Sequence, residues 1–154
     1  MQEPTLLVNA AFNGNLREVD CLLDAGADPD QPVGDGWTPL HAGIENWQPE
    51  AMRVLLARGA DPNRLVRGMT PLFHAIETEW DRATNRPAGL LFHLFGRRSR
   101  FVSPLPVLSA ILMEHGADPY GVTPGGEPLL TWVGRLNYPR ALEPLADSAA
   151  GPTI

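Results

Sequence analysis

The side chains of this sequence that could do chemistry are four histidines, one cysteine and a group of arginines. The histidines share no spacing, whereas a metal site needs several ligands that converge at characteristic spacings. They are His41, His74, His93 and His115. The sequence contains no Gly-rich phosphate loop, no Cys-x-x-Cys pair and no His-Glu-x-x-His motif. It therefore predicts a protein that is not an enzyme, with no catalytic residue, no metal ligand and no cofactor.

Charge is distributed unevenly along the chain. The net charge is −6 over 154 residues, but residues 81–103 carry five arginines against one aspartate, a local charge of +4. The remaining residues therefore carry −10, which argues against a surface that follows nucleic-acid phosphates and suits a basic protein partner. Two alternative functions depend on the arginines instead of the acidic remainder of the chain. Arg97, Arg98 and Arg100 either hold the anionic substrate of a small enzyme or contact nucleic acid or anionic lipid.

Short repeated motifs indicate which elements must position these side chains. Gly-Ala-Asp-Pro begins at Gly26, Gly59 and Gly116, so its copies start 33 and then 57 residues apart. A second marker lies 21 residues before each of the first two copies, as Thr-Leu-Leu from Thr5 and as Thr-Pro-Leu from Thr38. The next Thr-Pro-Leu lies 46 residues before the third copy, so that repeat contains 25 additional residues. Two markers in phase at such a period predict stacked structural repeats.

These motifs, above all Thr38-Pro39-Leu40-His41-Ala42, resemble those of the ankyrin-repeat family over about residues 5–79 and 105–135. The resemblance implies an all-α solenoid of about four repeats within a single domain over residues 1–154. Each repeat would have two antiparallel helices followed by a protruding hairpin. The expected repeats span about 5–34, 35–66, 67–123 with an insertion over 80–104, and 124–150.

Local signals agree with helices at these places. In repeat two, Thr38 can cap a first helix over about 39–46, and Pro49 opens a second helix that runs to Arg58. Gly59 then supplies the left-handed residue that ends a helix. The apolar stripe of the second helix is predicted to be Met52, Leu55 and Leu56, and that of repeat one to be Leu16, Val19, Leu22 and Leu23. Pro144 predicts that the last helix of repeat four is truncated or bent.

The resemblance also implies a binding surface, because ankyrin repeats bind partners with their hairpin tips and with the inner faces of their first helices. The tip residues here are Asp35, Trp37, Arg67 and Met69. The inner-face residues are Phe12, Asn13, Glu45, Asn46 and Glu77, with Trp47 at a position that is usually Gly. Trp37 is the predicted anchor, since Trp is enriched among binding hot spots, and packing against the neighbouring hairpin is its alternative role. His41 is implied to be structural.

The insertion over 80–104 combines the apolar run 90–95 with the arginine group. We expect the run to be at least partly helical and docked on the edge of the solenoid opposite the hairpin tips. An exposed patch for a partner is the alternative. The insertion would then form a second surface for an acidic partner or a second subunit. Its residues are Phe92, Phe95, Arg97, Arg98 and Arg100.

The sequence as a whole predicts a non-catalytic protein–protein interaction module that binds another protein, and neither nucleic acid nor a membrane. Small free-standing ankyrin proteins of bacterial type include immunity proteins, so an immunity or inhibitor role against a basic toxin or effector is one expectation. A regulatory or scaffold adaptor is the alternative. The single Cys21 excludes an intrachain disulfide, and the N-terminus does not resemble a signal peptide, so a cytoplasmic location is expected.

Overall fold

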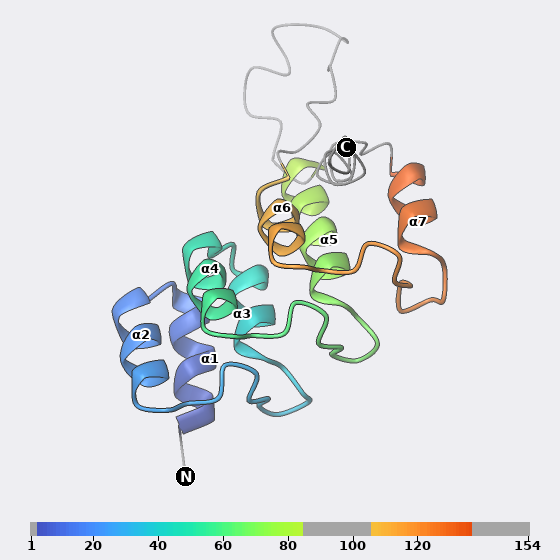
Figure 1. The fold of residues 1–154 in the computed structure, drawn as a ribbon. Coiled ribbons are helices and arrows are strands. Elements are labelled where there is room, and N and C mark those ends of the chain that lie inside the picture. Colours follow the sequence, from blue (N-terminus) through green and yellow to red (C-terminus); the bar gives the residue numbers. More distant parts are fainter. Residues whose placement is uncertain (1–2, 85–105, 137–154) are drawn as a thin grey trace, which may run out of the picture.

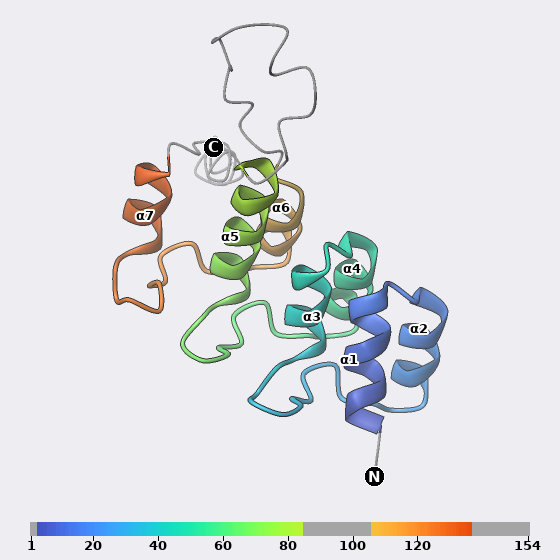
Figure 2. The ribbon, with the colours of Figure 1, turned by 180° about the vertical axis from the view of Figure 1, so that it is seen from behind.

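The computed structural model describes residues 3–84 and 106–136 of the chain (Figure 1). Its elements in these ranges are α1 (Glu3–Asn13), α2 (Leu16–Asp24), α3 (Pro39–Glu45), α4 (Pro49–Ala57), α5 (Pro71–Thr84), α6 (Val107–Glu114) and α7 (Leu129–Arg135). The first six helices form three pairs that stack in a row, with α7 at one end, and the connecting hairpins all project to the same side (Figures 1 and 2). The all-α repeat array predicted from the sequence is confirmed.

The Thr-Pro-Leu marker starts the first helix of a repeat. The buried Thr38 has an extended backbone, and its Oγ1 accepts a hydrogen bond from the backbone N–H of His41 at 3.3 Å. Thr70 does the same for the N–H of Phe73 at 3.1 Å. The proline that follows each threonine occupies the first helical turn, where its missing N–H leaves no hydrogen bond unmade.

The Gly-Ala-Asp motif ends the second helix of a repeat and closes a turn. Its glycine is left-handed in all three copies, with φ of 93°, 94° and 87° at Gly26, Gly59 and Gly116. Such a φ strains any residue with a Cβ, which explains why glycine stands there. The aspartate of each copy accepts a hydrogen bond from the backbone N–H two residues further on, at 2.8–2.9 Å.

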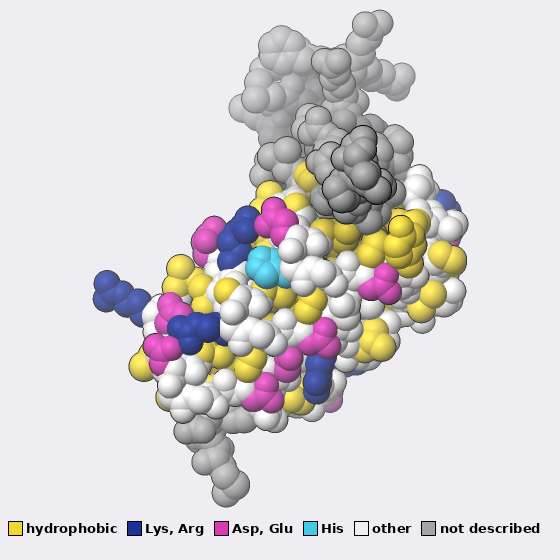
Figure 3. Space-filling view, viewed as in Figure 1, with side chains coloured by type: hydrophobic (Ala, Val, Ile, Leu, Met, Phe, Trp, Pro, Cys, Tyr) yellow, Lys and Arg dark blue, Asp and Glu magenta, His cyan; other side chains and the backbone are white. Residues whose placement is uncertain are grey.

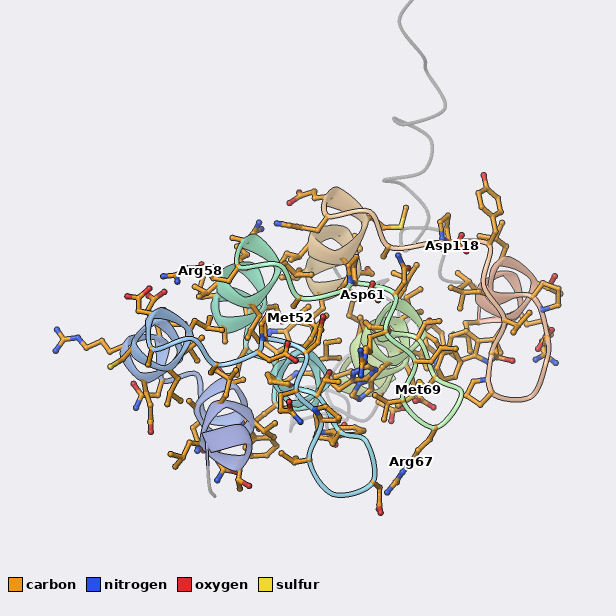
Figure 4. All side chains as sticks on the ribbon, turned by 60° about the horizontal axis from the view of Figure 1, so that its bottom comes forward. Met52, Arg58, Asp61, Arg67, Met69 and Asp118 are labelled. Carbon is orange, nitrogen blue, oxygen red and sulfur yellow. The ribbon has the colours of Figure 1, made fainter. Side chains whose placement is uncertain are left out.

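Polar side chains join each motif to the next one along the row. The carboxylate of Asp30 accepts a hydrogen bond from the backbone N–H of Asp61 at 3.0 Å. Asn63 lies at the corresponding place in repeat two, where its Oδ1 accepts from the N–H of Asp118 at 2.7 Å and its Nδ2 donates to the carbonyl of Gly116 at 3.0 Å. Figure 4 shows Asp61 and Asp118 on these successive loops. Neighbouring repeats are therefore held in register by hydrogen bonds between the side chains of one repeat and the backbone of the next.

Two apolar cores fill the space between the helices. The first joins repeat one to repeat two and consists of Leu7, Ala10, Ala11, Val19, Leu23, Leu55 and Ala60. The second extends from repeat two to α7 and includes Met52, Leu56, Leu72, Ile76, Ile111, Leu112 and Val133. Helix α4 contributes to both cores, with Leu55 in the first and Met52 and Leu56 in the second. The predicted stripe of α4 is therefore confirmed, whereas Leu16 of the stripe predicted for α2 is 37% exposed.

Helix α5 extends into the expected insertion. It has 14 residues, against 7 in α3, and its end at Thr84 lies within the range 80–104 that the sequence predicted as the insertion. The additional turn is helical because it has packing partners: Trp80 lies against the second core, and the guanidinium of Arg82 lies 4.7 Å from the ring centre of Trp47. The predictions for the apolar run 90–95, for the basic surface and for the last helix of repeat four lie outside the described residues.

A buried carboxylate joins α5 to the beginning of α6. Glu79 is 0% exposed and accepts hydrogen bonds from the backbone N–H groups of Leu108 and Ser109 at 2.7 and 3.0 Å, and from Ser109 Oγ at 2.8 Å. The residue preceding α6 is Pro106, which makes no side-chain capping bond. Glu79 therefore satisfies the free donors at the start of α6 from another helix.

Leu55→Ala is expected to destabilise the fold by about 2–5 kcal/mol, because it deletes a fully buried side chain at the junction of two repeats. The matched control is Leu65→Ala, since Leu65 is 62% exposed on a hairpin and its truncation should change the unfolding free energy by about 0.5 kcal/mol or less. Urea denaturation measures both. A loss below about 1 kcal/mol for Leu55→Ala would contradict the assigned packing of α4.

Glu79→Ala is expected to cost at least about 2 kcal/mol of unfolding free energy, since it leaves two buried N–H donors of α6 without their acceptor. Glu114→Ala is the control, because Glu114 forms only an exposed ion pair with Arg53 that is worth about 1 kcal/mol or less. Equal losses in the two variants would show that Glu79 does not hold the start of α6.

Candidate partner-binding surface

The first helices of the repeats line the inner side of the row. Helices α1, α3 and α5 contact one another more extensively than α2, α4 and α6 do, so the row curves toward the first helices. Figure 2, seen from behind, brings α5 in front of α6 and shows this side. The inner-face residues predicted from the sequence therefore lie on elements of the concave side.

Three carboxylates gather where α3 meets α5, and we call them the acidic face: Glu45, Glu77 and Asp81. All three residues are exposed. The pKa of Glu77 is raised above its usual value, and burial is the largest cause. Repulsion by Asp81 and Glu45 also raises the pKa, whereas the neighbouring His74 lowers it. Each carboxylate therefore adds to a local negative field that favours a cation. The sequence predicted Glu45 and Glu77 for this surface and did not predict Asp81.

A buried pair of histidines lies beneath the acidic face. The rings of His41 and His74 stack with centroids 5.7 Å apart and an interplanar angle of 18°. His74 Nε2 lies 2.8 Å from a carboxylate oxygen of Glu45, and His41 Nδ1 lies 2.8 Å from Thr38 Oγ1. His41 is 0% exposed and His74 is 4% exposed. The structural role expected for His41 agrees with this geometry, whereas His74 was not singled out because it occurs one residue later in its repeat than His41 does.

Trp37 covers this histidine pair. Its ring centre lies 5.6 Å from that of His41 and 5.5 Å from that of His74, in tilted and edge-on arrangements. The side chain is half-buried. Trp37 thus packs against α3 of its own repeat and α5 of the next, whereas the alternative role expected for it was packing against the neighbouring hairpin. Its outward surface remains a predicted contact.

The environment of His41 disfavours its charged form. Its pKa is lowered to about 4, first of all by burial and then by electrostatic repulsion from the neighbouring His74 ring, while an interaction with the backbone of Met69 opposes the shift. His41 is therefore neutral near neutral pH and acts as a structural hydrogen-bonding ring.

The predicted residues at the hairpin tips interact with one another. Arg67 and Asp35 form an ion pair between the tips of neighbouring hairpins, and both side chains remain mostly exposed. Figure 4 shows Arg67 at the outermost point of its hairpin and Met69 closer to the helices. Met69 is half-buried against the second core. The tips therefore form a connected edge in which Met69 contributes mainly to packing.

The remaining inner-face residues make contacts both within a repeat and between repeats. Asn46 donates from Nδ2 to the carbonyl of Phe12 at 2.7 Å, which joins α3 to α1. Asn13 donates to the carbonyl of Asn9 within α1 at 2.8 Å. The side chain of Phe12 is 40% exposed. Phe12 and Asn13 lie at the repeat-one end of the row, apart from the α3–α5 junction.

Trp47 occupies a left-handed turn between α3 and α4, with φ of 54°. Gly14 has the corresponding place in repeat one with φ of 67°, which explains why glycine is usual there. A left-handed residue with a side chain costs about 1–2 kcal/mol. Packing against the second core and the contact with Arg82 offset this cost. Trp47 is thus a structural residue of the turn that also supports the last turn of α5.

The outer side of the row has a different charge arrangement. Basic and acidic side chains lie next to one another on the face shown in Figure 3. The ribbon in the same view shows the second helices in front of the first helices (Figure 1). There Arg58 pairs with Asp24 at 2.7 Å and with Asp20 at 3.1 Å, and Arg53 pairs with Glu114 at 3.2 Å. Arginines thus offset carboxylates on the outer face, whereas a buried histidine contacts Glu45 on the acidic face.

No helix within residues 3–84 and 106–136 is long and apolar enough to cross a membrane. Among the same residues, no group of three or more His, Cys, Asp or Glu side chains could hold a metal ion.

The stability of the fold is expected to fall as the pH drops from about 6.5 to about 4, because His41 binds its proton more readily when the chain is unfolded. The contribution is fully present above pH 6.5 and amounts to at most about 3.5 kcal/mol at about 1.4 kcal/mol per pKa unit. Urea denaturation of the protein and of His41→Gln across this range measures it. The variant should show a flatter dependence on pH, and identical slopes would exclude this role.

Comparisons with known proteins fit this architecture. A family model described as ankyrin repeats in three copies matches residues 7–84. Over 129 residues, or 76% of this chain, the sequence is 33% identical to BTB/POZ domain and ankyrin repeat-containing protein NPR5 from Oryza sativa subsp. japonica, covering 26% of that protein. Over 55 residues, or 36% of each chain, it is 42% identical to protein phosphatase 1 regulatory subunit 27 from Mus musculus.

Over 77 residues, or 49% of this chain, it is 34% identical to the 2-5A-dependent ribonuclease from Mus musculus, covering 10% of that protein. This chain spans between 10% and 36% of the length of these relatives, and it belongs to the ankyrin-repeat family.

Proposed function

We propose that this protein binds a basic segment of another protein on the acidic face. The observation that carries the proposal is the gathering of Glu45, Glu77 and Asp81 at the α3–α5 junction, where their mutual repulsion contributes to the raised pKa of Glu77. A lysine or arginine of a partner placed there would relieve this repulsion. The excess of negative charge over the chain as a whole would also steer such a partner toward the protein.

The family supports binding rather than catalysis, since ankyrin repeats are protein–protein interaction modules. Two relatives carry names that describe a phosphatase regulatory subunit and a BTB/POZ protein. The ribonuclease that also matches is an enzyme by its name, but the matched part is 10% of its length. A regulatory adaptor is therefore the role that the comparisons support.

A more specific role is inhibition of a basic toxin or effector, as in an immunity protein. The supporting observation is the acidic face, because a strongly basic enzyme is commonly blocked by a surface of opposite charge. The identity of the captured partner distinguishes the two roles: a toxin whose activity the protein abolishes supports inhibition, and a signalling protein supports an adaptor.

The hairpin edge would extend the contact beyond the acidic face. Trp37 is half-buried against His74, the ring that contacts Glu45, and Asp35 and Arg67 have mostly exposed side chains. Because the ring of Trp37 also packs on both histidines, Trp37→Ala would disturb the fold. Trp37→Phe keeps an aromatic ring on the histidines and reduces only the outward surface.

The test is a charge reversal on the acidic face. Glu45→Lys/Glu77→Lys is expected to weaken the affinity for the partner captured from native lysate by at least about 30-fold, or about 2 kcal/mol. The reason is that two repulsive charges replace two attractive ones. Calorimetry with the purified partner gives the affinity, and circular dichroism verifies that the variant is folded.

Glu50→Lys/Glu114→Lys is the matched control, since it makes the same change in net charge on exposed residues of α4 and α6. Its affinity should stay within about threefold of the unchanged protein, or about 0.7 kcal/mol. If both double variants lose affinity equally, the effect belongs to net charge and the acidic face is not the binding surface.

A further inference from the structure

We propose that residues 139–146 form the second helix of repeat four, which is bent at Pro144 and covers the end of the row at α6 and α7. The inference is independent of the function proposed above, because it concerns the end of the row and not the acidic face. It starts from α7, which is the only first helix without a second helix of its own repeat among the residues that the structure describes.

Helix α7 is packed less closely than the other first helices. Within the described residues, α1, α3 and α5 each pack against the second helix of their own repeat, and α3 approaches α5 more closely than α7 does. Figure 1 shows α7 apart from α5 at the end of the row. The rings of Phe73 and Trp132 join the two helices, with centroids 4.7 Å apart. A helix of 7 residues depends on tertiary packing, so α7 needs a further partner.

The edge of α6 that faces away from α4 is apolar and incompletely covered. Met113 lies three residues before Gly116, as Leu56 lies three residues before Gly59. Leu56 is 7% exposed, because α6 packs beside α4, whereas Met113 is half-buried. Ala110, one helical turn before Met113, is also half-buried. This edge therefore lacks the kind of neighbour that α4 has in α6.

The sequence after α7 has a suitable residue for the turn into a second helix. Trp47 makes this turn in repeat two with φ of 54°, and it is the ninth residue after Thr38, which precedes α3. Asn137 is the ninth residue after Pro128, which precedes α7. Asparagine adopts a left-handed backbone more readily than most residues other than glycine. The chain can therefore turn at Asn137 as it does at Trp47.

The residues after this turn repeat the pattern of α4. From Pro49 the sequence reads Pro-x-Ala-Met-x-x-Leu, and from Pro139 it reads Pro-x-Ala-Leu-x-x-Leu, with each proline two residues after its turn. The last position of the pattern in α4 is the fully buried Leu55. Leu55 belongs to the first core together with Val19 and Leu23 of the preceding repeat. The same pattern predicts that the second segment buries its last leucine against repeat three.

Leu145 is that leucine, and Met113 is its expected contact. Met113 has the place in α6 that Leu23 has in α2, three residues before the helix-ending glycine. Residues 137–154 provide more chain than the turn and second helix of repeat two, which occupy 47–57. Because this segment leaves α7 directly beside the edge of α6, its effective concentration there is high. The chain's own segment is therefore favoured over a second molecule at this edge.

Pro144 bends this helix without ending it. It has the place of Val54 in α4 and of Cys21 in α2, which are half-buried and exposed. Proline leaves the carbonyl four residues earlier, that of Arg140, without its helical hydrogen bond. Because this side of the other second helices faces water, water can satisfy the freed carbonyl. The buried side of the helix, which includes Leu145, keeps its apolar residues.

The first arm of the test detects the contact directly in the full chain. Methyl NOE spectra are expected to show cross-peaks between Met113 and Leu145. If the Met113 methyl has no cross-peak to residues 137–154, the proposal is overturned. A sample that mixes two differently labelled copies identifies the alternative occupant. Cross-peaks from Met113 that arise only between copies would assign the edge to a second molecule and would also overturn the proposal.

The second arm measures amide hydrogen exchange of α7. Leu145→Asp is expected to lower the protection of the amides of Leu129–Arg135 at least about tenfold, because it removes the apolar cover of repeat four. Arg140→Gln is the matched control, since it makes the same change in net charge at the place of the exposed Glu50. It should leave this protection within about twofold of the unchanged protein. Unchanged protection in Leu145→Asp, or an equal loss in the two variants, would show that Leu145 does not cover this end of the row.

Discussion

The hydrogen bond from one Gly-Ala-Asp segment to the next is the constraint on which the rest of the structure depends. The Asp30 carboxylate and the Asn63 amide each reach the backbone of the following repeat, at 3.0 and 2.7 Å. A hydrogen bond to the backbone of the next repeat fixes both the distance and the rotation between the two repeats. Each helix pair therefore repeats the orientation of the pair before it. In the third segment the corresponding residue is Tyr120, which is 76% exposed. The hydrogen bond that Asp30 and Asn63 make to the next repeat is therefore not repeated in the same form toward α7.

This fixed register brings polar groups of neighbouring repeats together as well as apolar ones. The two cores require only apolar side chains on facing helices. The histidine pair requires more, because His74 of one repeat must lie over His41 of the preceding repeat and within 2.8 Å of Glu45. A buried polar group with an incomplete set of partners is costly, and both rings have one buried nitrogen without a hydrogen-bond partner. The junction of repeats two and three thus couples packing to charge on the concave side.

Much of the fold followed from sequence because its signals are local. Threonine caps, first-turn prolines and left-handed glycines act through neighbouring backbone, so their positions predicted α3 and α4 closely. The length of α5 could not be predicted in this way, because its last turn depends on the ring of Trp47 from another repeat. The role of Glu79 at the start of α6 could not be predicted for the same reason, since its hydrogen-bond partners lie about 30 residues further along the chain. In the proposed binding surface, Glu45 and Glu77 were predicted from the family pattern. The contacts of Trp37, Asp35 and Arg67 with their neighbours could not be predicted in this way, because they depend on the stacking of repeats.

The central claim is that a basic partner binds the concave side at the α3–α5 junction. The most direct measurement is the change in backbone amide chemical shifts of this protein when the captured partner is added. The account predicts that the largest changes fall around Glu45 in α3 and around Glu77 and Asp81 in α5, with the outer surfaces of α4 and α6 little affected. Changes confined to α2, α4 and α6, with α3 and α5 unperturbed, would contradict it.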